Sequence, residues 1–214
     1  EGMRRRLRSV LWTVAMQSVA SATRQTCGFR VVAREAGSIR EDNPIFATDP
    51  GYVQLAARAP SNLSARVVPV EGAGENARVI EHVLTTQECA AFITAAENMG
   101  FGEDAPVSLA RDVRKNDNVV WIADEQLNEG VFARARRWLP PTSPSGGPLV
   151  GLNRRWRLYR YNPGDVFRKH RDGSWPGSAL DAQGKLVDDS FGDGTWSEYS
   201  FLLYLNEDFE GGHT

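Results

Sequence analysis

The sequence predicts an α+β domain in which two helices precede a group of strands, and three observations support this. Residues 85–101 have apolar side chains at helical spacing up to Gly100, and residues 125–139 repeat that spacing. After a stretch rich in Pro and Gly at 140–148, the pattern changes to strands and turns. Helices followed by strands indicate helices packed against a β-sandwich or barrel.

The elements expected before this change have clear local signals. Alternating side chains predict a strand at 77–84, "ARVIEHVL". The helix that follows begins with the spacing of a capping box between Thr85 and Glu88. Cys89 lies in the apolar stripe of this helix and is expected in the core. A second strand is expected at 118–123, directly before the second helix.

The elements expected after residue 148 are strands and a long loop. Strands are predicted at 154–161, "RRWRLYRY", and at 197–206, "SEYSFLLYLN". The residues between them include an acidic, glycine-rich loop at 173–195. Long loops in compact domains are often functional, so we interpret this one as a mobile lid over a substrate.

The first 76 residues differ in composition from the rest. Residues 2–40 contain eight arginines and one acid, and a short apolar stretch within them ends in a small-x-small pattern. This suits a secretory signal peptide, and almost equally an organellar transit peptide or an arginine-rich tail. We interpret 1–40 as a leader, 41–76 as a linker without periodicity, and 77–214 as the domain. The leader favours the secretory pathway or ER lumen, with an organelle or the cytoplasm as alternatives.

Charge and composition exclude several classes of partner. Residues 41–214 carry 17 basic and 25 acidic side chains, and such an acidic body neutralises phosphates poorly, so nucleic acid is a disfavoured partner. No run approaches the roughly 20 apolar residues of a membrane span. The two cysteines, Cys27 and Cys89, are too few for a disulfide scaffold and lack a zinc-binding spacing. The sequence leaves the oligomeric state open.

A His-x-Asp motif is the strongest candidate for chemistry. His170 and Asp172 lie in "YNPGDVFRKHRDGSW" (161–175), and residues i and i+2 of an extended segment point to the same side. An imidazole and a carboxylate are two of the three ligands in the 2-His-1-carboxylate triad, which leaves positions on Fe(II) for a cosubstrate and O₂. On its own the motif equally describes a solvated polar loop.

With its surroundings, the motif resembles the prolyl 4-hydroxylase-like family of Fe(II)- and 2-oxoglutarate-dependent dioxygenases. The resemblance rests on "RLYRYNPGDVFRKHRDGS" (157–174) and "SFLLYLNEDFEGGHT" (200–214). Family members have a Tyr-x-Pro-Gly-x-x-Phe-x-x-His-x-Asp-Gly pattern, then a Leu-Leu-Tyr-Leu-Asn strand and Gly-Gly-Glu-Thr. The likeness extends over 77–214, because "RDVRKNDNVVWIAD" (111–124) and the preceding helix are similar to the family's helical support and following strand.

The resemblance implies a double-stranded β-helix, or jelly-roll, core supported by the N-terminal helices and truncated before its last strands. It implies hydroxylation of a C–H bond of a prolyl or other peptidyl residue in a protein or peptide substrate. Fe(II) would be the metal, 2-oxoglutarate and O₂ the cosubstrates, and ascorbate the reductant that keeps the iron reduced. His170 and Asp172 correspond to the first two iron ligands, and Phe167 would flank the metal.

Other residues receive roles from the same resemblance. Tyr161, Leu203 and Thr214 would line the 2-oxoglutarate pocket. Arg114 and Asn116 match a polar Arg-x-Asn pair near the mouth, where they could contact substrate. The alternatives are that the tyrosine, the leucine and the phenylalanine beside the metal only fill the barrel, and that Arg114 is an ordinary surface charge.

The sequence departs from the family in two ways. The family places its second iron-binding histidine tens of residues after Gly-Gly-x-Thr, and a basic partner for the 2-oxoglutarate 5-carboxylate slightly later; neither occurs here. His213 is adjacent to Thr214, so on a strand it would face away from the pocket. We therefore expect the chain as given to bind iron poorly and to be inactive. The alternative functions are an inactive fragment or binding module with the same fold, or a dioxygenase acting on a small molecule or nucleic acid.

Overall fold

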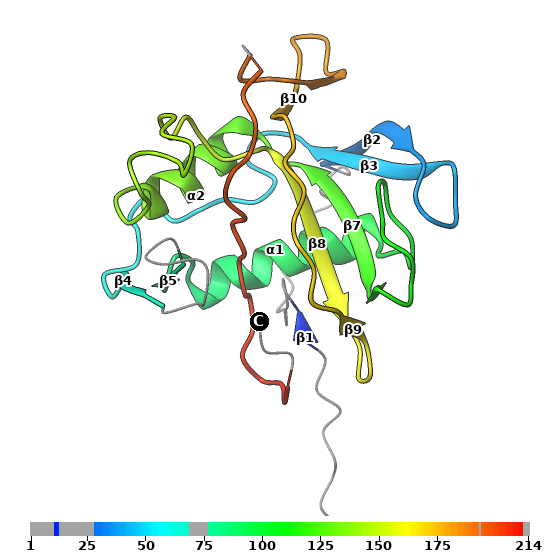
Figure 1. Ribbon diagram of the computed structural model, residues 1–214, viewed down its shortest axis with the longest axis horizontal. Helices are drawn as coiled ribbons and strands as arrows, with labels where there is room; N and C mark the ends of the chain where they lie inside the picture. The colour runs from blue at the N-terminus through cyan, green and yellow to red at the C-terminus, as the bar shows by residue number, and fades with distance from the viewer. Residues whose placement is uncertain (1–10, 13–27, 69–76, 193, 212–214) are drawn as a thin grey trace, which may run out of the picture.

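The structure is a computed structural model that describes residues 11–12, 28–68, 77–192 and 194–211. These residues form a mixed α+β fold with a five-stranded sheet, three two-stranded sheets and two helices (Figure 1). The predicted α+β class is confirmed. In chain order the elements are β1 (Leu11–Trp12), β2 (Phe29–Glu35), β3 (Asn43–Thr48), β4 (Ser64–Val67), β5 (Arg78–Glu81), α1 (Thr86–Met99), β6 (Arg114–Lys115), β7 (Asp117–Ile122), α2 (Glu125–Arg136), β8 (Arg155–Tyr161), β9 (Val166–Phe167), β10 (Ser178–Leu180) and β11 (Leu186–Asp188).

The five-stranded sheet has the order β1-β8-β7-β3-β2. β3 and β7 pair in parallel, whereas the other neighbours are antiparallel. β7 lies at the centre, and its residues from Asn118 to Ile122 are all buried. A strand covered on both faces has this nearly continuous apolar pattern. Within the described residues, the sheet is open rather than closed into a barrel.

The two helices pack on one face of this sheet, and Figure 1 shows α1 crossing behind β7 and β8. The capping box predicted for α1 is present, because the Thr85 side chain accepts from the Glu88 N–H and the Glu88 side chain accepts from the Thr85 N–H. Phe92 of α1 stacks on Trp156 of β8 with ring centroids 5.6 Å apart, and Trp121 of β7 meets Trp156 edge-on at 5.5 Å. This aromatic cluster fixes α1 on the sheet.

The opposite face of the sheet has a smaller core. Ile45, Val120 and Ile122 are each at most 1% exposed there. The β10–β11 hairpin covers them through Leu180 and Leu186. The segment interpreted as a mobile lid therefore contains a hairpin that packs on the sheet. Neither helix of the described part has the length and apolar character needed to cross a lipid bilayer.

Two segments differ from the elements expected at their positions. β2 and β3 lie within the residues interpreted as leader and linker, yet β3 sits between β7 and β2 in the main sheet. β3 has only six residues, follows Asp42 and contains Pro44, so its composition is that of a linker. Its parallel partner β7 is more than 70 residues away, so no local pattern indicates the pairing. Conversely, residues 197–206 form no strand. Their side chains do alternate, with Phe201, Leu203 and Leu205 packed against the core and Leu202 and Tyr204 exposed.

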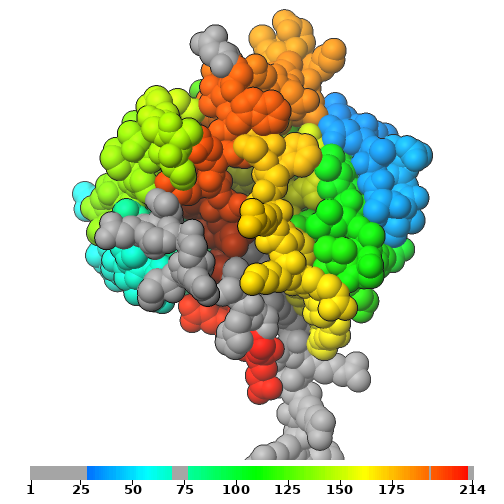
Figure 2. All heavy atoms as spheres, in the orientation of Figure 1, coloured from blue at the N-terminus to red at the C-terminus, as the bar shows by residue number. Residues whose placement is uncertain are grey.

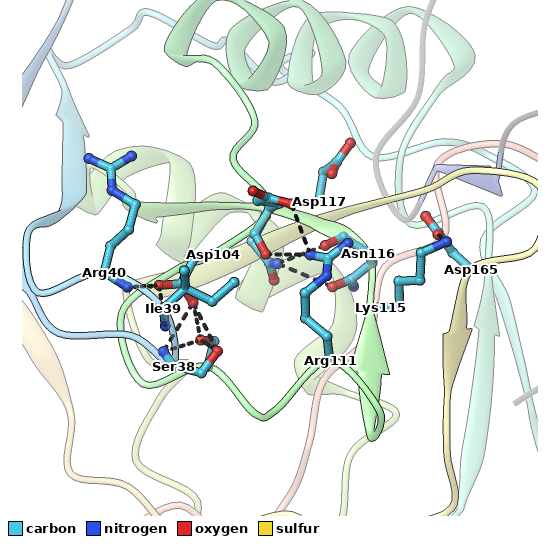
Figure 3. Close-up of polar contacts among 12 residues, drawn as sticks. Ser38, Ile39, Arg40, Asp104, Arg111, Lys115, Asn116, Asp117 and Asp165 are labelled. Carbon is cyan, nitrogen blue, oxygen red and sulfur yellow. Dashed lines mark hydrogen bonds and ion pairs between the residues drawn. The ribbon is translucent and has the colours of Figure 1, made fainter.

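A buried carboxylate ties the start of the sheet to the loop before β6. Asp104 accepts hydrogen bonds from the backbone N–H groups of Ser38, Ile39 and Arg40, and from the Asn43 side chain (Figure 3). Gly37 is required beside it, because a Cβ there would lie 2.3 Å from Asp104 Oδ2. The contact anchors the loop between β2 and β3 to a residue more than 60 positions later in the sequence.

Candidate functional site

An open groove of about 2700 Å³ runs alongside β8. Figure 2 shows it as a hollow between the yellow residues of the 161–175 segment and the orange-red residues that follow 197. Its lining includes nearly all of β8 and β9 and the segment 194–205. All of the described residues assigned to iron and 2-oxoglutarate by resemblance line this groove, namely Tyr161, Phe167, His170, Asp172 and Leu203, together with Arg114 from the possible substrate contacts.

β8 presents two different faces because successive side chains of a strand alternate. Its even-numbered residues Trp156 and Leu158 belong to or pack against the main core. Its odd-numbered residues point to the opposite face, and Arg157, Tyr159 and Tyr161 line the groove there; the edges of Trp156 and Leu158 also reach the groove. The register with β7, in which Trp121 pairs with Trp156, holds this division in place.

The chain turns after β8 and returns through β9. Asp165 N–H donates to the Asn162 carbonyl at 2.9 Å, and Gly164 has a φ of 85°, which a glycine adopts readily. β9 then pairs with β6, and Phe167 lies opposite Arg114. This short ladder positions the residues that lead to the His-x-Asp motif.

His170 and Asp172 converge as their spacing predicted. His170 Nε2 lies 3.0 Å from Asp172 Oδ1, and His170 Nδ1 lies 2.8 Å from the Arg168 carbonyl oxygen. The second carboxylate oxygen of Asp172 accepts a hydrogen bond from the Ser200 hydroxyl. The side chains are 28% and 55% exposed, respectively, so the pair is open to the groove.

These contacts decide which atoms are free to bind a cation. A carbonyl oxygen only accepts, so His170 Nδ1 carries the proton that it donates to Arg168. A neutral imidazole then presents the Nε2 lone pair to a carboxylate oxygen, which is repulsive unless a proton or a metal ion lies between them. Metal-binding histidines in proteins commonly donate their other N–H to a carbonyl in this way.

The separation of the two donor atoms also fits a metal ion. For metal–ligand distances of about 2.1 Å, two ligands at right angles stand about 3.0 Å apart. His170 Nε2 and Asp172 Oδ1 have this separation. The donor set, one imidazole nitrogen and one carboxylate oxygen, suits Fe(II) as a part of the facial triad. Among the described residues, however, no three His, Cys, Asp or Glu side chains gather around one point.

A stack of three side chains forms one wall of the site. The rings of Phe167 and His170 are stacked with centroids 3.8 Å apart. The Arg114 guanidinium also packs on Phe167, with its Cζ 3.8 Å from the ring centroid. The same Cζ lies 4.8 Å from the centroid of Tyr159. Arg114 Nη1 also donates to the Tyr159 hydroxyl at 3.2 Å. Phe167 thus lies beside the proposed ligand, and Arg114 is held by aromatic rings rather than free at the surface.

Tyr161 lines the groove, and Asn116 lies close to it but is not part of the lining. Burial raises the pKa of Tyr161 to about 12, although the charge of Arg114 opposes this. The Asn116 side chain also acts to lower the pKa of Tyr161. The Asn116 Nδ2 is buried and has no hydrogen-bond partner among the described residues. Asn116 is 2% exposed, so it lies beneath the groove instead of at its mouth.

The segment 200–205 brings residues to the site that the motifs did not indicate. Ser200 contacts Asp172, and Tyr204 lies close enough to Tyr161 to influence its pKa. Leu203 lines the groove but packs against the main core with its neighbours. The alternation of the segment could have indicated Tyr204, whereas the contact of Ser200 depends on how two distant segments meet. Thr214 lies outside the described residues.

None of the protein-family models, curated proteins or solved structures compared with this chain matches it.

Proposed function

We propose that this protein is an Fe(II)- and 2-oxoglutarate-dependent dioxygenase of double-stranded β-helix fold that hydroxylates a prolyl or other peptidyl residue. The observation that carries the proposal is the pair of donor atoms on His170 and Asp172, 3.0 Å apart, with the imidazole tautomer set by the Arg168 carbonyl. The resemblance of the flanking sequence supports iron and 2-oxoglutarate over other metals and cosubstrates.

The residues of this chain would hold and orient the metal. His170 Nε2 and Asp172 Oδ1 are the ligand atoms, and the Ser200 hydroxyl keeps the carboxylate rotated toward the imidazole. Phe167 covers one face of the His170 ring and excludes water from it. Tyr161, half-buried and protonated at neutral pH, offers a hydroxyl for a cosubstrate oxygen. The third ligand in this proposal is not among the described residues.

Iron bound there would supply the oxidising power, with 2-oxoglutarate and O₂ as cosubstrates and succinate, CO₂ and the hydroxylated peptide as products. Ascorbate would return iron that has become oxidised to Fe(II).

The shape of the groove supports a peptide substrate. It is long and open along β8, and large aromatic side chains remain exposed along its walls. Trp175 is 53% exposed, Trp196 57% and Tyr204 44%. Aromatic surface of this kind binds extended peptide segments, because rigid rings provide apolar contact with little loss of conformational entropy.

Metal binding provides the first test. Mn(II), a redox-stable substitute for Fe(II), is titrated into the protein and followed by water-proton relaxation, which detects weak sites. We expect His170→Ala and Asp172→Ala to weaken binding by roughly tenfold or more, since each removes a ligand. His82→Asn is the matched control, because His82 is exposed, lies outside the groove and has a φ of 61° that asparagine tolerates. Equal Mn(II) affinity in all four proteins would exclude the metal site.

Turnover provides the second test. Succinate release from 2-oxoglutarate is measured with the full-length protein, Fe(II), ascorbate and proline-containing peptides. Succinate formation should require Fe(II) and should be lost in His170→Ala but not in His82→Asn. The same rate in His170→Ala and in the unaltered protein would refute the assignment of His170 as an iron ligand.

A further inference from the structure

Three basic side chains lie beside the proposed metal ligand His170. The stretch 166–171, "VFRKHR", contains Arg168, Lys169 and Arg171 and no acid. All three are exposed and line the groove. Within the part of the chain that the structure describes, none of them forms an ion pair with a carboxylate. This wall of the groove therefore carries positive charge without a counter-charge.

Arg168 is held in position by the backbone of the segment before β6. Its N–H donates to the Val113 carbonyl at 3.0 Å, and its Nε donates to the Asp112 carbonyl at 2.7 Å. Its two terminal nitrogens make no hydrogen bond with any described residue. A guanidinium fixed in this way presents its remaining edge, and parallel N–H groups match the two oxygens of a carboxylate.

The positive charges do not help the proposed metal site. Adjacent Cα atoms are about 3.8 Å apart, so Lys169 and Arg171 begin one residue from the histidine ligand on either side. Both would repel a divalent cation bound there, although solvent and salt screen the repulsion. Asp165, the acid before this stretch, is already paired with Lys115 at 3.0 Å. A partner that brings negative charge into the groove would remove the repulsion.

Two exposed tryptophans continue the same wall. Trp175 is 53% exposed and Trp196 is 57% exposed. Backbone contacts hold the two together, because the Ser197 N–H donates to the Trp175 carbonyl at 2.9 Å and Trp196 forms an isolated bridge with Pro176. The Trp175 ring lies close to Gly173, since a Cβ on this glycine would be 3.5 Å from Trp175 Nε1. The wall therefore has a basic section followed by an aromatic section.

We propose that the groove recognises an acidic peptide, in which Asp or Glu residues flank the residue to be hydroxylated; this rests on the proposed function. Arg168, Lys169 and Arg171 bind the acidic side chains, and Trp175 and Trp196 contact apolar or prolyl residues beside them. An extended peptide rises about 3.3 Å per residue, so charges next to the metal ligand select acids within about three residues of the hydroxylated position. The same charges reject basic peptides.

A single-stranded nucleic acid is the other anionic polymer that stacks on aromatic rings. The rest of the chain disfavours it, because residues 41–214 carry 25 acidic and 17 basic side chains. A nucleic-acid backbone has a charge at every nucleotide and requires positive charge along its whole path. The basic section is confined to the stretch 166–171, which suits a short acidic segment.

The test compares three fluorescein-labelled peptides by fluorescence anisotropy, using the full-length protein in EDTA. Each peptide has a central proline, flanked by glutamates, by glutamines or by lysines. The glutamate peptide should bind roughly tenfold more tightly than the glutamine peptide, because several exposed ion pairs of modest strength act together. This advantage should shrink as NaCl is added. Equal affinity for the three peptides, or no saturable binding of the glutamate peptide, would overturn the proposal.

Charge-removing variants locate the recognition. Lys169→Gln combined with Arg171→Gln should abolish most of the preference for glutamate over glutamine. The matched control is Lys185→Gln combined with Arg58→Gln, because these two side chains are exposed, lie outside the groove and form no ion pair with a described residue. The proposal fails if the groove variant keeps the full preference. It also fails if the control variant loses as much, because overall charge alone would then explain the preference.

The metal site and the peptide site can fail separately. His170→Ala should keep the preference for the glutamate peptide while losing Mn(II) binding. Lys169→Gln combined with Arg171→Gln should tighten Mn(II) binding by about twofold, because two repelling charges are removed. Weaker Mn(II) binding in this variant would assign the two residues to the metal site and refute their role in peptide binding. Tighter binding of a labelled oligothymidylate than of the glutamate peptide would assign the groove to single-stranded nucleic acid and refute the proposal.

Discussion

Replacing Asp104 by asparagine should strongly destabilise the fold, because the six hydrogen bonds to its carboxylate are arranged asymmetrically. Oδ2 accepts from the Ile39 N–H, the Arg40 N–H and the Asn43 amide, at 3.1, 2.8 and 2.9 Å. Oδ1 accepts from the Ser38 N–H and from the hydroxyls of Ser38 and Ser108. An asparagine amide must therefore place its NH₂ at the Oδ1 position, since hydroxyls can reverse their role and N–H groups cannot.

The expected loss follows from these contacts. Three bonds to Oδ2 lose their charge assistance, at roughly 1 kcal/mol each from the difference between charged and neutral hydrogen bonds. The Ser38 N–H faces an opposing donor but keeps Ser108 Oγ as an acceptor at 2.9 Å, so it adds at most about 1 kcal/mol. Because the site can relax in part, we expect Asp104→Asn to lower the free energy of unfolding by about 3 kcal/mol.

Urea denaturation at pH 7, followed by far-ultraviolet circular dichroism, measures this difference. Asp181→Asn is the matched control, because Asp181 accepts two backbone N–H bonds, from Gln183 and Lys185, at 2.9 Å but is not buried. Its loss should cost under about 1 kcal/mol, as expected for hydrogen bonds in contact with water. A free energy of unfolding for Asp104→Asn within 1 kcal/mol of the Asp181→Asn value would refute this reasoning.

Four further predictions concern ionisable and metal-contacting groups. Burial would raise the pKa of Asp104, but hydrogen bonds from neighbouring hydroxyl, backbone and amide groups outweigh it and lower the pKa. A carboxyl group with a lowered pKa in the folded state stabilises the protein at pH values above its unfolded pKa of about 4. The difference in free energy of unfolding between the unaltered protein and Asp104→Asn should therefore shrink as the pH falls below about 4, which urea denaturation at acid pH measures. Glu88→Gln leaves the buried Arg134 charge without a counter-charge and should cost about 3–5 kcal/mol in urea, whereas Glu88→Leu combined with Arg134→Met should cost less. In a spectrophotometric titration at 295 nm, Tyr161→Phe should remove the tyrosinate absorbance that appears near pH 12 in the unaltered protein. If the absorbance missing from the variant is instead the part that appears near pH 10, burial does not raise the pKa of Tyr161. Ser200→Ala should weaken Mn(II) binding several-fold in relaxation titrations, because the carboxylate ligand loses its orienting hydroxyl; unchanged affinity would contradict this role.

The parts of the fold that the sequence predicts correctly are those with strong local signals. α1 has a capping box and a terminal glycine, β7 has the apolar run of a buried strand, and β8 is rich in the aromatic residues that strands favour. β3 has no such signal: it is short, begins with Asn43-Pro44, and is a strand because β7 and β2 pair with it. The segment 197–206 illustrates the reverse case, since it has strand-like alternation but no neighbouring strand to pair with in the described chain.

The same distinction applies to the candidate site. His170 and Asp172 could be predicted because a spacing of two residues in an extended segment is enough to bring their side chains together. The Ser200 contact and the packing of Arg114 between aromatic rings could not be predicted, because each depends on how segments distant in sequence approach one another. The tautomer of His170 depends on one carbonyl orientation, which no residue pattern specifies.

The position of the candidate site depends on the register of one strand. Trp156 of β8 is fixed by its stacking on Phe92 and its edge contact with Trp121, so the odd-numbered residues must face the groove. A slip of one residue would remove Trp156 from the helix-side core and place Arg157 there. This is unfavourable because a buried charge without a partner replaces an aromatic ring. The turn after β8 then begins at a fixed point, β9 meets β6 with Phe167 opposite Arg114, and His170 follows three residues later. Packing on the helix face of the sheet thus determines where the metal pair lies along the groove.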